Sequence, residues 1–218
     1  MKVLAVSMAV ALGLTLVASS SAQDKPRPTR EQALRDLTSP DVEARRLATA
    51  WLGELATPDD LPALFRQLRD SDDLVRALTE NSIWQTWSRS GDAKVDALFK
   101  VGVEQMNQGR TEAAIDTFTE IIRRKPDFAE GWNKRATIYF LVGDYDKSLA
   151  DCDEVIKRNP QHWGALAGYG QIYVQLDRPE EALTYFQRAL AVNPNLQNVE
   201  NMIQQLKQVV IEKRRGTI

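Results

Sequence analysis

The sequence predicts an all-α protein, a right-handed α-α superhelix (solenoid) built from helix-turn-helix repeats. Apolar residues recur at the three- and four-residue spacing of amphipathic helices from residue 30 nearly to the end of the chain. No sustained alternating run rich in Val, Ile and Thr, the pattern of a half-buried strand, interrupts this spacing. The second half also repeats itself at an interval of 34 residues, which is the signature of stacked units.

The composition favours a binding module over an enzyme. The 218 residues are 43% hydrophobic and 27% charged, as expected of a folded soluble protein. A single cysteine excludes an intramolecular disulfide, and a single histidine excludes His-rich metal sites. With 28 basic and 30 acidic residues the net charge is −2, so we expect no global attraction to nucleic acid or to anionic membranes.

The first 22 residues have the three-part form of a secretory signal peptide. Lys2 precedes an apolar stretch over residues 3–18, and small residues follow up to Ala22, where we expect cleavage. The mature chain is therefore expected to be secreted or periplasmic, with no membrane span after cleavage. The alternative is an uncleaved anchor, although the stretch is shorter than the roughly 20 residues of a spanning helix. Residues 23–29 hold two prolines among charged residues and predict a flexible tail.

Residues 30–94 contain a weaker repeat with an interval of 31 residues. The segment 39–45 (SPDVEAR) is echoed by 70–76 (DSDDLVR), each an acidic turn that precedes an arginine. This pattern resembles HEAT-like helical repeats in their short form. The alternative is a few irregular helices packed against the next unit. In either case Trp51, Trp84 and Trp87 are expected in the core or in a seam between elements.

The 34-residue period divides the second half into three helix pairs and explains how each pair packs. Prolines stand at Pro126, Pro160 and Pro194, where each would stop a second helix and redirect the chain. In the first pair, the small residues Gly102 and Ala114 would let two antiparallel helices approach closely. A single pair cannot cover its own apolar face, so neighbouring pairs must stack.

At these residues the chain resembles the tetratricopeptide repeat family. The resemblance implies three units, residues 95–128, 129–162 and 163–196, and it rests on recurring packing positions. These positions are Gly102, Ala114, Phe118 and Pro126 in the first unit, Ala136, Tyr139, Ser148 and Pro160 in the second, and Gly170, Tyr173, Ala182, Phe186 and Pro194 in the third. Residues 197–218 then predict a C-terminal capping helix, because repeat arrays need a solvated end.

The sequence contains none of the common catalytic motifs. It has no Gly-rich phosphate loop, Cys-x-x-Cys pair, His-Glu-x-x-His helix or Gly-x-Ser-x-Gly elbow, so no cofactor and no metal is expected. His162 is expected to pack at the seam between units, and Cys152 to be a buried small hydrophobe. The acidic cluster around Asp151 is interpreted as a solvated face, and Gly164 and Gly168 as residues that thin a groove wall.

What remains as a functional site is the concave face formed by the first helices of the three units. The resemblance implies that this face binds extended or helical peptides. The helical register places nine residues on it: Phe99, Val103 and Met106; Asn133, Lys134 and Thr137; and Ala167, Gln171 and Val174. Lys134 is the single cation of this set, which argues against a clamp for a terminal carboxylate. The alternative is that this face is merely solvated, or is filled by the chain's own ends.

The leading functional hypothesis is an exported, non-catalytic adaptor or scaffold that binds a protein or peptide in its groove, within an envelope-associated complex. The sequence identifies neither the partner nor the oligomeric state. The alternative is an accessory factor of an enzyme or of a lyase-like cofactor-attachment system. That alternative requires a ligand pocket between the two halves, near Trp84, Trp87 and His162.

Overall fold

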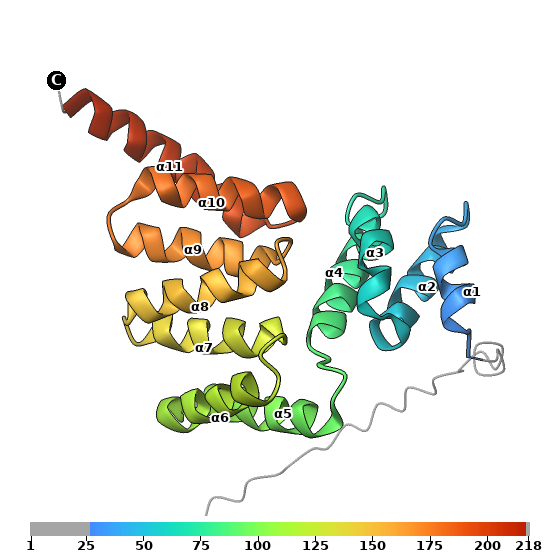
Figure 1. The fold of residues 1–218 in the computed structure, drawn as a ribbon. Coiled ribbons are helices and arrows are strands. Elements are labelled where there is room, and N and C mark those ends of the chain that lie inside the picture. The colour runs from blue at the N-terminus through green and yellow to red at the C-terminus, as the bar shows by residue number, and fades with distance from the viewer. Residues whose placement is uncertain (1–26, 217–218) are drawn as a thin grey trace, which may run out of the picture.

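The computed structural model describes residues 27–216, and these form helices with no strand among them. Figure 1 shows a stack of helix pairs in the second half of the chain, with the N-terminal helices standing beside the stack. The predicted all-α solenoid is therefore confirmed. The predicted signal peptide lies outside the described residues. None of the helices described is long and apolar enough to cross a membrane.

The N-terminal half contains four α-helices and one short 3-10 turn. Their bounds are α1 Arg30–Asp36, α2 Val42–Leu55, the 3-10 turn η1 Pro58–Asp60, α3 Leu61–Gln67 and α4 Asp73–Trp87. Polar side chains begin three of these helices: Thr29 caps α1, Asp41 caps α2 and Asp72 caps α4, each by accepting a backbone N–H of the first turn.

The 31-residue echo in the sequence has a geometric counterpart. Arg45 donates from Nη1 to the carbonyl oxygens of Ser39 and Pro40, at 2.9 and 3.3 Å. Arg76 repeats this with the carbonyl oxygens of Asp70 and Ser71, at 2.8 and 3.3 Å. The two acidic turns therefore have the same local fold, although the HEAT-like resemblance itself stays a prediction.

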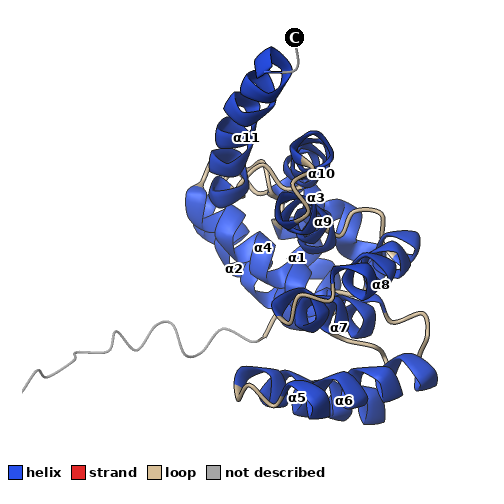
Figure 2. Cartoon of the chain, turned by 90° about the vertical axis from the view of Figure 1, so that its left-hand side faces the viewer, coloured by secondary structure: helices blue, strands red, loops and turns tan. Residues whose placement is uncertain are grey.

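The second half consists of three antiparallel helix pairs and one final helix. The pairs are α5 Ala93–Asn107 with α6 Thr111–Arg124, α7 Ala129–Leu141 with α8 Tyr145–Arg158, and α9 Trp163–Gln175 with α10 Pro179–Val192; the final helix is α11 Gln197–Gly216. α11 lies against α10 and extends beyond it (Figures 1 and 2). Its buried residues Ile203, Leu206 and Val210 cover the apolar end of the stack.

Backbone conformation explains the turns inside and between the pairs. Gly109 and Gly143 have positive φ angles of 69° and 80° two residues before α6 and α8 begin, and Asp177 takes this place before α10 with φ 53°. The second helices end two residues before the prolines predicted to stop them. Pro126, Pro160 and Pro194 are exposed in the turns, so they end helices and contribute little to packing.

Close approach within the first and third pairs depends on a glycine that lies beneath a phenylalanine. An added Cβ at Gly102 would lie 2.8 Å from Cζ of Phe118, and one at Gly170 would lie 2.5 Å from Cε1 of Phe186. In the middle pair Ser148 donates from its hydroxyl to the carbonyl oxygen of Ala136 at 2.8 Å, so a polar residue is satisfied at the close contact. Ala114 and Ala182 are fully buried. Tyr139 and Tyr173 are half-buried, and each has an arginine guanidinium over its ring.

The N-terminal helices share one hydrophobic core with the second and third pairs. This core joins Leu64, Leu68, Ile83 and Trp87 to Trp163, Leu166 and Ala189. Two hydrogen bonds to backbone fasten the contact: Arg69 donates to the carbonyl oxygen of Ala191, and Asn195 to that of Leu68, both at 2.8 Å. The two halves are therefore packed as one body.

Candidate functional site

The first helices of the pairs, α5, α7 and α9, lie next to one another and form the face predicted to bind a partner. Helix α4 reaches this face and places Trp84 on it. An added Cβ at Gly164 would lie 2.7 Å from Cη2 of Trp84, and Nζ of Lys134 lies 5.8 Å from the Trp84 ring. Gly164 therefore makes room for an indole of the chain itself. Part of the face is therefore covered by an internal helix of the chain and not by either of its ends.

A buried polar pair lies under this contact. The Nδ1 atom of His162 accepts the backbone N–H of Ala165 at 3.0 Å, which caps α9 and leaves the ring proton on Nε2. Nε2 then donates to Oε1 of Glu130 at 2.5 Å, and both side chains are almost completely buried. Burial alone would raise the pKa of Glu130, but His162, Lys134 and Asn133 outweigh it, so its pKa lies below the usual range.

The same histidine is held between aromatic rings at the seam. Trp87 stacks on it with ring centroids 4.5 Å apart and planes 17° apart, and Trp84 meets it edge-on at 5.3 Å. Trp163 lies 4.4 Å from Trp87, between centroids. The seam location for His162 was predicted. Both ring nitrogens are engaged, so His162 has no nitrogen free for a substrate. The rings of Trp84 and Trp87 pack directly against it.

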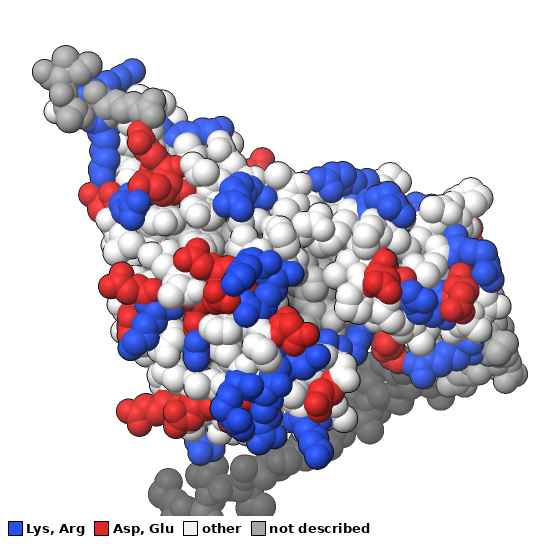
Figure 3. Space-filling view, in the orientation of Figure 1, with Lys and Arg blue, Asp and Glu red and all other residues white. Residues whose placement is uncertain are grey.

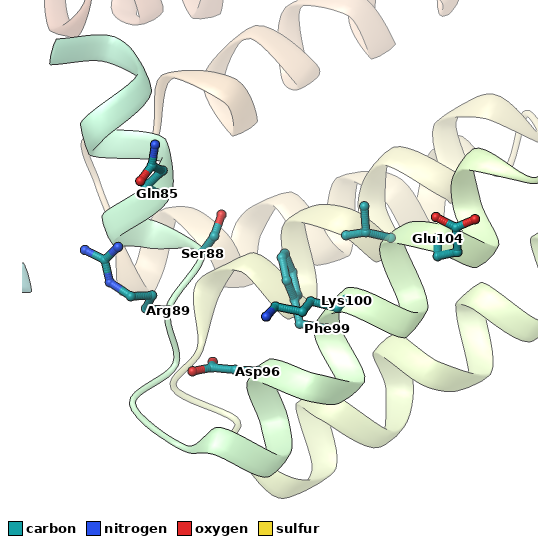
Figure 4. Close-up of a pocket in the computed structure, with 8 residues that line it drawn as sticks. Gln85, Ser88, Arg89, Asp96, Phe99, Lys100 and Glu104 are labelled. Atoms are coloured by element: carbon teal, nitrogen blue, oxygen red, sulfur yellow. The ribbon is translucent and has the colours of Figure 1, made fainter. Parts of the chain in front are cut away.

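A wide opening lies between the end of α4 and the side of α5 (Figure 4). We call it the α4–α5 pocket; its volume is about 650 Å³. Its lining residues are Gln85, Ser88, Arg89, Asp96, Phe99, Lys100, Val103 and Glu104. Phe99 is buried and meets Phe118 and Phe128 edge-to-face, with centroids 5.9 and 5.4 Å away, so the apolar floor of the pocket is firmly held.

Some of the charged side chains of the α4–α5 pocket already have hydrogen-bond partners within the chain, and one has no ion-pair partner. Arg89 donates to the carbonyl oxygens of Gly53 and Ala56, at 2.6 and 2.7 Å, and burial lowers its pKa. Oδ1 of Asp96 accepts the backbone N–H and the hydroxyl of Ser90. Lys100 is exposed and forms no ion pair with any residue in the described range 27–216. Lys100 is therefore the cation available to a ligand.

A second, much smaller opening of about 100 Å³ lies between α7, α8 and α9. It includes Asn133, Thr137 and Gln171 from the predicted set, together with Gly168 and Cys152. Burial raises the pKa of the Cys152 thiol to about 12, so this cysteine is inert, as expected of a buried small hydrophobe.

Two family models described as tetratricopeptide repeat match residues 101–156 and 139–206. A TPR repeat-containing protein of Rhizobium etli is 32% identical over 155 residues, which are 71% of this chain and 76% of that protein. The chain belongs to the tetratricopeptide repeat family.

Other tetratricopeptide proteins match more narrowly. Tetratricopeptide repeat protein 12 of Mus musculus is 28% identical over 58% of this chain, and the Hsp70-Hsp90 organizing protein of Triticum aestivum is 26% identical over 54% of it. The matched parts are 18% and 20% of those two proteins. The chain therefore spans about a fifth of their length.

Solved tetratricopeptide structures share the fold. The first TPR of Spaghetti (RPAP3), bound to the HSP90 peptide SRMEEVD, has a TM-score of 0.53 at 24% identity and covers 55% of this chain and 96% of that one. The Sgt2 TPR domain from Aspergillus fumigatus has a TM-score of 0.54 at 19% identity, over 58% of this chain and 85% of that one. At these identities the likeness establishes the repeat fold.

The nine residues predicted for the tetratricopeptide face fall into four groups in the structure. Phe99 and Val103 line the α4–α5 pocket, and Asn133, Thr137 and Gln171 line the small opening. Lys134 lies beside Trp84 and 3.9 Å from Oε2 of Glu130. The remaining three are half-buried against core clusters: Met106, Ala167 and Val174.

Two members of that set are mainly packing residues. Phe99 is 7% exposed, and its ring lies in the core of the first pair. Asn133 is equally buried and donates from Nδ2 to Oε2 of Glu130 at 3.1 Å. Each offers one edge to an opening, so Val103, Thr137 and Gln171 are the better positions for substitutions.

The interpretation of the acidic cluster on α8 as a solvated face is wrong for Asp151. Its carboxylate is buried and accepts two hydrogen bonds from the Arg135 guanidinium, at 2.7 and 2.8 Å, which raise the pKa of Arg135. Asp153 accepts the hydroxyl of Tyr169. Asp151 and Asp153 stand two positions apart and so do not face each other on the helix. Each instead pairs with a residue of a neighbouring helix, and the spacing within one helix does not predict such a contact.

Sequence reasoning did not identify most of the α4–α5 pocket. Asp96, Lys100 and Glu104 stand four residues apart on α5, and this spacing could have indicated a charged stripe beside Val103. No sequence signal indicated that Gln85, Ser88 and Arg89 would lie opposite them. Basic and acidic side chains are interspersed over the face drawn in Figure 3, in line with the balanced composition.

Proposed function

We propose that this protein is an exported, non-catalytic adaptor that receives a protein or peptide segment on its concave face, within an envelope-associated complex. The observation that carries the proposal is the α4–α5 pocket, because it opens at the first helix of the first unit and has an apolar floor with a free cation at its edge. Its volume of about 650 Å³ lies within the range of about 300–1,000 Å³ usual for ligand sites.

The relatives support the binding part of this proposal. One similar structure is a TPR domain bound to an HSP90 peptide, and one similar sequence is an Hsp70-Hsp90 organizing protein. The side chains of the present groove differ from a carboxylate-gripping site, since Phe99 and Val103 supply apolar surface at the first unit. A mixed apolar and polar peptide segment fits such a wall better than a bare terminal carboxylate.

Export and envelope location rest on the N-terminal sequence. Residues 1–22 combine one lysine, an apolar stretch and small residues, the pattern of a cleaved signal. Cell fractionation followed by N-terminal sequencing tests this part. A chain that begins at Gln23 in the periplasm or medium supports export, and a chain that keeps Met1 in the cytoplasm contradicts it.

Co-purification with matched variants tests the groove. Val103→Glu places a charge on the pocket floor, whereas Val101→Glu makes the same change at a half-exposed position of α5 outside the pocket. Gln171→Arg crowds the small opening, and Gln204→Arg repeats that change on the exposed side of α11. We expect Val103→Glu and Gln171→Arg to lose the partner while both controls retain it. Equal recovery by all four variants and the wild type would contradict a groove-bound partner.

A further inference from the structure

The α4–α5 pocket is a composite site, because only one of its two walls belongs to a tetratricopeptide unit. Gln85 comes from the last turn of α4, and Ser88 and Arg89 directly follow this helix (Figure 4). Phe99, Lys100 and Val103 come from α5. The N-terminal helices hold their wall in place through the shared core with the second and third units. The site therefore depends on how the two halves of the chain are docked.

The rest of the concave face offers much less room. Trp84 lies on the wall at Gly164 and Lys134, and the opening beside Asn133 and Gln171 is about 100 Å³. That volume is below the range usual for ligand sites. A partner segment that lies on this face therefore finds its main anchoring space in the α4–α5 pocket.

The floor of the pocket selects an apolar side chain. Val103 is half-buried beside Phe99, whose ring is held by Phe118 and Phe128. A large aliphatic side chain placed there removes apolar surface from water on both partners, which is the main source of affinity at such an anchor.

The edge of the pocket selects an anionic group. The guanidinium of Arg89 is bonded to carbonyl oxygens, so no carboxylate is hydrogen-bonded to it, and Lys100 has no ion pair within residues 27–216. The carboxylate of Asp96 opposes these two cations: it accepts two hydrogen bonds from Ser90, keeps its negative charge and interacts electrostatically with Arg89, so the two cations exceed it by one charge. Figure 4 shows Glu104 at the opposite end of the α5 wall. An excess of positive charge therefore lies at the end near Ser88.

We propose that the α4–α5 pocket binds an extended peptide segment in which a large aliphatic residue and an aspartate or glutamate stand two positions apart. The aliphatic side chain lies on Phe99 and Val103, and the carboxylate pairs with Lys100. Positions two apart on an extended chain face the same side about 6.5–7 Å apart, which suits the roughly 5–6 Å between side chains at Lys100 and Val103, three residues apart on a helix. This inference rests on the proposed function and adds the place and the chemistry of the segment.

Amide chemical shifts of the isotope-labelled protein, titrated with three blocked pentapeptides, test the proposal. The probes are Gly-Asp-Ser-Leu-Gly, Gly-Lys-Ser-Leu-Gly and Gly-Asp-Ser-Ser-Gly. We expect the first to shift amides of residues 85–89 and 96–104. The lysine probe should bind about threefold to fivefold more weakly, as for loss of an exposed ion pair. The serine probe should bind roughly tenfold or more weakly, as for loss of a buried leucine.

Charge reversal separates recognition from a merely structural effect. Lys100→Glu should lower the affinity for the aspartate probe and raise the affinity for the lysine probe. Lys94→Glu, the same change at an exposed position in the first turn of α5 outside the pocket, should alter neither affinity.

Three outcomes overturn the inference. The first is equal affinity of the aspartate and lysine probes for the wild type. The second is shifts centred on Asn133, Thr137 and Gln171, which would leave groove binding standing and move its site. The third is no shift at millimolar concentrations of any probe, in which case co-purification with Val103→Glu decides the proposed function independently.

Discussion

Two glycines of α9, two residues apart, should respond in opposite directions to the same substitution. An added Cβ at Gly170 would lie 2.5, 2.6 and 2.8 Å from three ring atoms of Phe186. At Gly168 the nearest atom would be Sγ of Cys152 at 3.8 Å, an ordinary contact. Phe186 is 1% exposed, so its ring has no solvent to move into.

The magnitudes follow from two opposing effects. Replacing a mid-helix glycine by alanine favours the helix by about 0.8–1 kcal/mol. At Gly168 almost no overpacking opposes this gain, so Gly168→Ala should stabilise the protein by roughly 0.5–1 kcal/mol. At Gly170 overpacking costs about 1–3 kcal/mol, and three contacts inside 3 Å place it in the upper part of that range. Gly170→Ala should therefore lose roughly 1–2 kcal/mol net.

Urea unfolding followed by circular dichroism measures both variants against the wild type. We expect the midpoint to rise for Gly168→Ala and to fall for Gly170→Ala, at an unchanged slope. If Gly170→Ala were as stabilising as Gly168→Ala, the close approach of α9 and α10 at Phe186 would be refuted, and with it the role of the small residue in the repeat.

Three further predictions concern the first pair, the buried pair and the acidic turns. Ala114 is fully buried, so Ala114→Glu should destabilise by roughly 2–4 kcal/mol through overpacking and an unpaired charge; a melting temperature within a degree or two of the wild type would contradict the register. Glu130→Ala leaves the Nε2–H of His162 buried without an acceptor and should cost about 1–3 kcal/mol. Glu130→Gln keeps an acceptor oxygen, and equal urea midpoints for the two variants would count against this hydrogen bond. Arg46 holds the pKa of Asp72 at about 2, so its contribution to stability is complete above the unfolded value of about 3.9 and is lost as pH falls toward 2; Asp72→Asn should flatten this acid limb of the unfolding curve, and an unchanged limb would contradict the pairing.

The period of 34 residues was sufficient to locate the helix pairs. The second helices end at Arg124, Arg158 and Val192, each two residues before a repeated proline, and α11 begins at Gln197 as predicted. These features depend on residues close together in the chain: a proline without an N–H, a glycine with positive φ, a small residue facing a phenylalanine. Local chemistry of this kind is visible in the sequence.

The candidate site was visible only in part. Val103 and Gln171 were placed on the correct face because helical register follows from spacing. The wall from α4 and the indole of Trp84 over Gly164 were not predicted, since they join residues that no spacing rule relates. Asp151 shows the same limit, because its partner Arg135 lies on another helix.

The sequence by itself determined the helical class, the repeat units and the residues that make each pair close, because these depend on patterns within about one unit. The tertiary structure decided how the N-terminal helices dock on the stack: with Trp84 on the wall of the groove, Trp87 against His162, and Arg89 opposite Lys100. The physical reason is that burial of the shared core selects this docking among many possible ones. The α4–α5 pocket exists because this docking brings the end of α4 next to α5.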